Sequence, residues 1–315
     1  MAKIQKQLMI TSFFNKSKPT NFIIVFVVTL LAFVLARKSL FVEGLSFEVL
    51  MKQLVLVFVA LVSILLLNFI ASKNSLTNKS NYEVLLFSLF LLYITETTNN
   101  ANILVSNFFV LLGLRRIISL HSQKDIKKKL FDAAFWIGVA SLFYFWSILF
   151  FILIIVTLML YPDKNLRHWI VPFLGILTVF VISCAVSLVV YNNYFEIFNY
   201  PPGVSYDFSN YNALRYLVAI TVLLSFGIWS SFFYLQNIRK QKKRYRVSFK
   251  SVIVAALIGF IILVLAPDKD GGEFIFLFAP LSIIIANYIE IIQDKWFKEL
   301  FLSVLVVLPF ILLLL

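Results

Sequence analysis

The sequence has little charge, almost no cysteine or histidine, and few prolines and glycines. Its single cysteine excludes a disulfide framework, and its two histidines exclude a histidine-rich metal or haem site. Charged side chains make up 14% of the 315 residues, against about 25% in soluble domains. Nine glycines and eight prolines leave little room for flexible linkers. Because 61% of the side chains are hydrophobic, these absences exclude a water-soluble fold.

Apolar runs recur along the whole chain. A helix needs about 20 apolar residues to cross a bilayer, and the shorter runs would rely on local thinning or on burial against neighbours. The stretch at 130–161 carries one charge, Asp132, and is too long for one span. We read it as two helices that meet near Tyr144 and Trp146, since such aromatic rings prefer the headgroup level. The predicted fold is an all-α, polytopic transmembrane helical bundle of eleven spans, near 21–36, 50–71, 83–96, 102–114, 130–144, 146–161, 169–191, 214–235, 251–266, 274–289 and 300–315.

The basic residues predict which loops face the cytosol. Lys and Arg concentrate in 1–20, 115–129 and 236–250, and the positive-inside rule places such segments in the cytosol. We therefore expect a cytoplasmic N-terminal segment at 1–20, one transmembrane domain at 21–315, the amino terminus inside and the carboxyl terminus outside. The first helix is expected to be retained, because the polar segment before it is longer than that of a typical signal peptide. Only five basic residues then fall outside, namely Arg37, Lys38, Lys52, Arg215 and Lys269.

The sequence shows no familiar catalytic motif. Ionisable residues at the bilayer midplane mark ion paths, and here each one falls in a loop or near a predicted helix end. Glycine-rich phosphate loops, paired-histidine zinc motifs and nucleophile-elbow serines are missing. We expect no metal and no cofactor. Topology accounts for much of the net charge of +13, so no nucleic-acid partner is expected. An anionic-lipid or protein-docking patch is the alternative use of the basic loops.

The first outer loop combines two cations with two carboxylates. Arg37 and Lys38 could hold a lipid phosphate, while Glu43 or Glu48 accepts a proton from an acceptor hydroxyl. Glu43 and Glu48 are therefore the candidate catalytic residues, and Arg37 and Lys38 are candidate substrate ligands. The plain alternative is that the carboxylates mark the outer face and the cations snorkel.

Two further outer loops supply candidate substrate-binding residues. The turn at 267–273 carries Asp268, Asp270 and Glu273, and its alternative interpretation is a solvated turn. The loop at 191–214 is rich in aromatic residues, among them Tyr194 and Tyr200, whose rings could lie on a sugar, an isoprenoid chain or the membrane surface. An interfacial lid without a ligand is the alternative there. Asn99, Asn100, Asn102 and Asn107 add hydrogen-bonding groups at the outer end of the fourth span.

Two stretches carry a family resemblance. The segments SNFFVLLGLRRIISL at 106–120 and LFDAAFWIGVASLFY at 130–144 resemble an uncharacterised family of polytopic bacterial inner-membrane proteins. More distantly, the order of elements is similar to that of the GT-C membrane glycosyltransferases. That resemblance implies transfer of a sugar from a polyprenyl-phosphate donor at the outer leaflet, with a carboxylate as base. Here Glu43 and Glu48 stand five residues apart, whereas that superfamily commonly shows adjacent acids or an Asp-x-Asp pair.

The leading functional hypothesis is an integral protein of the bacterial cytoplasmic membrane that handles lipid-linked saccharide at the outer leaflet. Polyprenyl-phosphate-dependent glycosyl transfer is its candidate activity, and membrane lipids and the lipid-linked sugar are its expected partners. The alternative is a non-catalytic subunit that scaffolds an envelope export or assembly complex through a membrane-protein partner. A flippase or neutral-solute carrier is a third hypothesis, weakened by the missing midplane charges.

Overall fold

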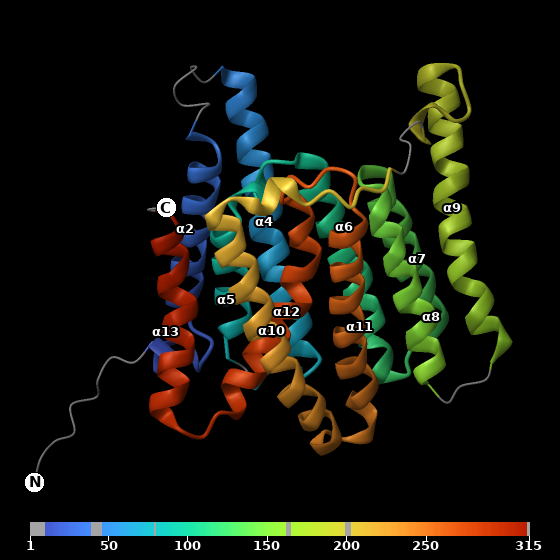
Figure 1. Ribbon diagram of the computed structural model, residues 1–315. Helices are drawn as coiled ribbons and strands as arrows, with labels where there is room; N and C mark the ends of the chain where they lie inside the picture. Colours follow the sequence, from blue (N-terminus) through green and yellow to red (C-terminus); the bar gives the residue numbers. More distant parts are fainter. Residues whose placement is uncertain (1–9, 39–45, 79, 162–164, 199–202, 314–315) are drawn as a thin grey trace, which may run out of the picture.

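The computed structural model describes residues 10–38, 46–78, 80–161, 165–198 and 203–313 (Figure 1). Every regular element in this part of the chain is helical. The helices are α1 (Ile10–Phe14), α2 (Pro19–Ala36), α4 (Phe47–Lys73), α5 (Tyr82–Tyr93), α6 (Ala101–Ile118), α7 (Ile126–Phe143), α8 (Phe150–Leu160), α9 (Leu166–Tyr191), α10 (Leu214–Lys240), α11 (Lys243–Leu265), α12 (Ile275–Ile291) and α13 (Lys295–Leu312). Short 3-10 turns are η1 (Thr95–Thr98), η2 (Ser119–Ser122), η3 (Phe145–Leu149), η4 (Glu196–Phe198), η5 (Ser209–Asn212) and η6 (Gly272–Phe274).

The predicted all-helical fold is confirmed, and each predicted apolar run coincides with a helix. The long run at 130–161 divides at Tyr144, whose extended backbone ends α7 before η3 and α8 begin. Within the described residues, seven helices are long and apolar enough to cross a membrane: α2, α4, α6 with η2, α9, α10, α11, and η6 with α12. The chain is therefore a membrane protein. Helix α5 and the η3–α8 segment are apolar but shorter, and α7 and α13 carry charges in their first turns.

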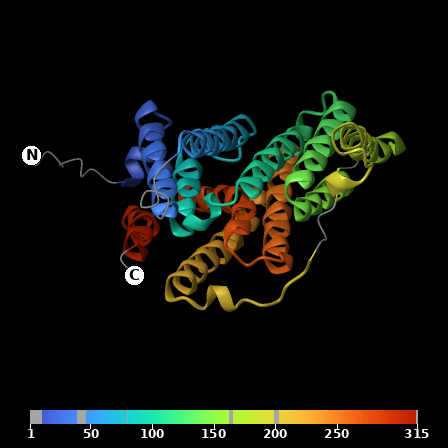
Figure 2. The ribbon, with the colours of Figure 1, turned by 90° about the horizontal axis from the view of Figure 1, so that it is seen from above.

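From α2 to α13 the helices run side by side in alternating directions (Figure 1). The carboxyl ends of α2, α5, α7, α9 and α11 point to what we call the upper end, as drawn in Figure 1. Those of α4, α6, α8, α10 and α12 point to the opposite, lower end. Helix α9 stands at one edge of the bundle and α2 and α13 at the other (Figure 2).

Helices α5 and α12 form the core of the bundle. Every residue of α5 is buried, which explains how an apolar helix of 12 residues can lie among longer ones. Its neighbours α2, α4, α12 and α13 shield its ends. The aromatic ring of Phe278 in α12 lies edge-on to Phe87 at 6.4 Å and against Phe90 at 5.5 Å.

Small residues bring neighbouring helices into close contact. A Cβ atom added to Gly259 of α11 would lie 2.8 Å from the carbonyl oxygen of Phe276 in α12, and one added to Gly175 of α9 would lie 2.8 Å from that of Phe131 in α7. Between α6 and α7, Ser106 donates a hydrogen bond to the carbonyl of Ala140 at 2.9 Å. Such contacts are what holds helices together where lipid removes the hydrophobic driving force.

Candidate functional site

A cavity of about 430 Å³ opens at the upper end of the bundle. Its wall comes from four segments that are far apart in sequence. They are the start of α6, the end of α7 with η3, the loop at 191–214, which we call the aromatic loop, and the turn at 267–273, which we call the acidic turn. The lining residues are Asn100, Asn102, Ser141, Leu142, Phe143, Tyr144, Phe145, Trp146, Ile197, Phe198, Pro267 and Asp268. The lining thus combines amides, hydroxyls and one carboxylate with several aromatic rings.

The acidic turn contributes Asp268 directly to the cavity wall, where its side chain is exposed. Its neighbour Asp270 accepts a hydrogen bond from the backbone N–H of Gly272 at 2.8 Å. Asp270 also interacts with the side chain of Asn100, so the acidic turn and the asparagine cluster meet. Although its side chain reaches solvent, surrounding protein raises the pKa of Asp270, and the charge of Asp268 acts in the same direction.

Glu273 lies elsewhere. It is fully buried, and the hydroxyl of Tyr211 donates a hydrogen bond to its Oε1. Because Tyr211 belongs to η5, at the end of the aromatic loop, this contact anchors that loop to the start of α12. Glu273 is not among the residues that line the cavity. It therefore fixes the aromatic loop in place and does not contact a ligand in the cavity.

Tyr144 and Trp146 form the aromatic side of the cavity. The Tyr144 ring stacks on Phe276 at 5.5 Å, which fixes it against the core. Burial raises the pKa of the Tyr144 hydroxyl, so the hydroxyl stays protonated and can donate a hydrogen bond. The half-buried Trp146 donates from its indole N–H to the carbonyl of Gly203 at 3.3 Å, which ties the far side of the aromatic loop to η3.

The aromatic loop enters the cavity through Ile197 and Phe198. Phe198 packs on Phe180 of α9 with ring centres 5.4 Å apart. The two tyrosines that the sequence favours do not take part: Tyr194 is 58% exposed and does not line the cavity, and Tyr200 lies outside the described residues. Below the loop, buried Lys269 donates to the carbonyls of Leu263 and Val264 and so caps α11, and burial lowers the pKa of Lys269.

Of the four candidates at 37–48, the three that the structure describes do not line the cavity. Arg37 is buried and donates to the hydroxyl of Thr98 at 3.0 Å, to the backbone carbonyl of Thr98, and to that of Phe33 at 3.4 Å. Burial lowers the pKa of Arg37 to about 10, so the guanidinium is still charged at neutral pH. Lys38 and Glu48 are exposed and do not line the cavity, and Glu43 lies outside the described residues.

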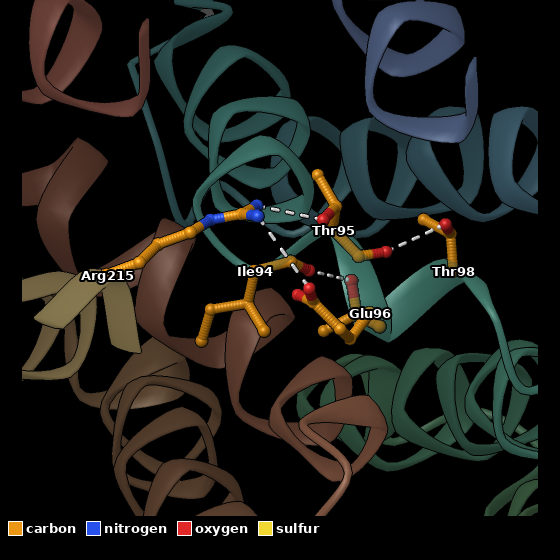
Figure 3. A network of polar contacts seen from close by, with 6 residues as sticks. Ile94, Thr95, Glu96, Thr98 and Arg215 are labelled. Atoms are coloured by element: carbon orange, nitrogen blue, oxygen red, sulfur yellow. Dashed lines mark hydrogen bonds and ion pairs between the residues drawn. The ribbon is translucent and has the colours of Figure 1, made fainter. Parts of the chain in front are cut away.

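A second arginine holds the turn η1 from the other side (Figure 3). Arg215, near the start of α10, donates to the hydroxyl of Thr95 at 2.9 Å and approaches Glu96 at 3.8 Å. Within the turn, the hydroxyl of Thr98 donates to the carbonyl of Thr95 at 2.9 Å. Arg37 and Arg215 thus clamp η1 between α2 and α10.

This clamp positions the cavity wall, because Asn100 lies only two residues after the end of η1. Asn100 caps α6, and its Oδ1 accepts hydrogen bonds from the backbone N–H groups of Asn102 and Ile103 at 3.1 and 3.2 Å. Sequence reasoning found the asparagines but missed the roles of Thr95, Thr98 and Arg215. The available signal was the polar run TETTNN at 95–100 between two apolar helices.

The arrangement suits recognition of an uncharged, hydroxyl-rich group. Aromatic faces and a few convergent polar groups are the usual lining of small-molecule pockets, which measure about 300–1,000 Å³. Among the described residues there is no group of three or more His, Cys, Asp or Glu side chains that could hold a metal ion. Asp268 is the one carboxylate among the residues that line the cavity.

Comparison with known proteins places the chain in a family and gives no activity. No curated protein and no solved structure is significantly similar to it. A family model described as "Family of unknown function (DUF6427)" matches residues 13–314, nearly the whole chain. The chain therefore belongs to this family of unknown function.

Proposed function

We propose that the protein binds the sugar end of a lipid-linked saccharide in the upper cavity, at the outer leaflet of a bacterial cytoplasmic membrane. The observation that carries this proposal is the composition of one wall: Trp146 and Tyr144 stand with Asn100, Asn102 and Asp268 around a single cavity. A sugar offers an apolar ring face to the aromatic rings and hydroxyls to the amides and the carboxylate.

The orientation follows from charge. The basic runs at 127–129 and 239–246 lie at the lower end of the bundle, so the positive-inside rule makes that end cytosolic. The upper end is then the outer one. We propose eleven crossings with the amino terminus inside and the carboxyl terminus outside, because α5, α7, α8 and α13 run alongside the longer helices (Figure 1). The enclosure of α5 supports its inclusion despite its short length.

The lipid part of such a ligand would leave the cavity along exposed aromatic rings. Phe143 and Phe145 line the cavity and are 41% and 44% exposed. Both lie where α7 gives way to η3, at the level where a helix end meets the headgroups. An isoprenoid chain can pack on these rings while the saccharide stays in the polar half of the cavity.

Glycosyl transfer at this site would use Asp268 as the base in place of Glu43 or Glu48. Asp268 accepts the proton of an acceptor hydroxyl, whose oxygen forms a bond to the anomeric carbon of the sugar. The bond from that carbon to the lipid phosphate oxygen breaks, and the lipid phosphate leaves with the bonding electrons and inversion at carbon. Asp268 is preferred because it is the carboxylate on the cavity wall, whereas Glu48 is exposed on α4 and does not reach that wall.

The test separates binding from chemistry. The full-length protein in lipid nanodiscs is titrated with polyprenyl-phosphate-linked sugars, and binding is measured by isothermal titration calorimetry. Trp146→Ala is expected to weaken binding about fivefold, since loss of a stacked ring removes about 1 kcal/mol. Asp268→Asn should retain binding and lose transfer to an acceptor. The control is Trp296→Ala, because Trp296 is 75% exposed at the start of α13. Unchanged binding in the Trp146 variant contradicts the proposal.

The alternative function is a scaffold for an envelope complex. Helix α9 favours it, because α9 packs mainly on α7, and most of its apolar surface is not covered by the described residues. A partner helix would find there a broad apolar face that includes Val181, Val189 and Leu177. Copurification of a stoichiometric membrane partner from mild detergent, lost on Val181→Trp, would favour the scaffold over the transferase.

A further inference from the structure

We propose that a monovalent metal cation binds at the lower end of the bundle, between Glu83 of α5 and Glu290 of α12. This site is separate from the upper cavity and does not depend on the function proposed for it. No motif points to it, because Glu83 and Glu290 are 207 positions apart in the chain and look like ordinary helix-end acids.

Glu83 is a buried carboxylate without a partner. Its exposed fraction is 0%, and neither Oε1 nor Oε2 accepts a hydrogen bond from any described residue. An ionised carboxylate withdrawn from water is strongly disfavoured unless a counter-charge or hydrogen-bond donors compensate it. Its place in the first turn of α5 gives it a favourable helix dipole, which is too weak to replace the missing partners.

Glu290 lies next to Glu83 because the loop before α5 is bound to the last turns of α12. The Oε1 and Oε2 of Glu290 accept from the backbone N–H of Asn78 at 2.8 and 2.9 Å, and the hydroxyl of Ser80 donates to Oε1 at 2.5 Å. One turn earlier in α12, Asn287 donates to the carbonyl of Leu76 at 2.9 Å. Ser80 precedes Glu83 by three residues, and the two carboxylates interact electrostatically.

Among the described residues, Glu83 has no positive charge beside it. Lys298 of α13 interacts with Glu290 and with Glu299. Glu299 is partly exposed to solvent and is bound by the N–H and hydroxyl of Thr11 and the N–H of Ile10. Glu83 is thus the fully buried carboxylate that lacks a counter-charge in the described part of the chain, and one monovalent ion would supply that charge.

Other buried oxygen atoms at this end also lack partners. The side chain of Asn81 is fully buried, and both its Oδ1 and Nδ2 are without a hydrogen bond among the described residues. The Oδ1 of Asn21, in the first turn of α2, is likewise buried and unbonded. Protonation of Glu83 would remove its charge but would leave these amides unsatisfied. A cation with one or two bound waters can satisfy carboxylate and amide oxygens together.

The test measures the thermal unfolding of the full-length protein in detergent at fixed pH and ionic strength. Sodium, potassium and the bulky N-methylglucamine cation are compared as chlorides. We expect sodium or potassium to raise the unfolding temperature by several degrees in a saturable manner, and N-methylglucamine to have no such effect, because a ligand that binds only the folded state stabilises it. In Glu83→Gln the cation response should be lost.

The matched control is Glu48→Gln, which removes an exposed carboxylate from the opposite end and should keep the wild-type response. Should Glu83→Gln fail to fold, saturable binding of radioactive sodium or potassium to the wild-type protein, reduced in Glu290→Gln, gives the same answer. Equal unfolding temperatures in all three cations overturn the proposal. So does a selective response that survives in Glu83→Gln.

Discussion

Arg37 at the end of α2 donates a hydrogen bond to the hydroxyl of Thr98 in η1, with 3.0 Å between Nη1 and Oγ1. This contact joins residues that are 61 positions apart, and Thr98 precedes Asn100, a residue of the cavity wall, by two positions. Arg37, which the sequence suggested as a ligand of a substrate phosphate, therefore helps to position the cavity wall and does not itself line the cavity.

Replacing Arg37 should destabilise the protein and distort the cavity together. Arg37→Ala removes three hydrogen bonds of a charged donor and leaves the carbonyl of Thr98 buried without a partner, which we expect to cost about 2–4 kcal/mol. Arg37→Lys should recover only part of the stability, because the ammonium group of lysine cannot make the same set of hydrogen bonds as the planar guanidinium group. Thermal unfolding in detergent measures the effect. Lys38→Ala, one residue away and exposed, is the control, and an equal loss there would contradict the assigned role.

Two glycines should differ in their tolerance of alanine. A Cβ on Gly259 would lie 2.8 Å from the Phe276 carbonyl oxygen, a backbone atom that moves only with α12. One on Gly227 would lie 2.7 Å from Cδ1 of Leu281, the end of a flexible side chain. We expect Gly259→Ala to cost about 1–3 kcal/mol and Gly227→Ala clearly less. Unfolding measured under the same detergent conditions compares them, and the reverse order would refute the close contact of α11 with α12.

The contact of Tyr211 with Glu273 should control access to the aromatic loop. Tyr211→Phe removes the side-chain donor to Glu273, whose Oε2 already lacks a hydrogen-bond partner among the described residues. We expect faster proteolysis between 192 and 213 and a loss of about 2–3 kcal/mol. Combining it with Glu273→Gln should give less than the sum of the two single losses, because both act on one contact. Additive losses would show that the two residues act independently.

Asp270 should make stability depend on pH. Its pKa is raised in the folded state, so at a pH below the ordinary range of a carboxyl it is protonated in both states and carries no penalty. As the pH rises through that range, the unfolded state loses its proton first, and wild-type stability falls. Asp270→Asn should remove this fall while keeping an oxygen to accept from Gly272. Unfolding temperatures of both proteins, measured as the pH is raised from acidic to neutral, should diverge in favour of the variant. Parallel curves would contradict the prediction.

Hydropathy predicted the helices well because each apolar run reports its own local environment. Even the division at Tyr144 was predictable, since aromatic residues interrupt a run too long for one helix. Loops gave less. Asn100, Asp268 and Phe198 were each noticed as parts of separate loops, but their meeting on one cavity depends on how the helices pack, which no local pattern encodes.

The carboxylates also show that a local sequence pattern does not predict contacts between distant helices. Glu48, Glu83 and Glu290 all stand near helix ends in the sequence, yet Glu48 is exposed and Glu83 is fully buried. What separates them is the neighbouring helix. The residues Leu76, Asn78 and Ser80, which are bound to α12, lie beside the start of α5, whereas the start of α4 is exposed. Arg37 is a similar case, because its burial follows from the position of η1.

The burial of α5 limits the order in which the helices can assemble while the chain is being synthesised. A helix of only 12 residues is too short to remain in lipid by itself, and α12, which closes one side of it, is synthesised almost 200 residues later. Until α12 emerges from the ribosome, the newly made amino-terminal helices must shelter α5 and the acidic Glu83, or a membrane chaperone must do so. A nascent chain arrested before α12 should therefore be a preferred substrate for membrane quality-control proteases.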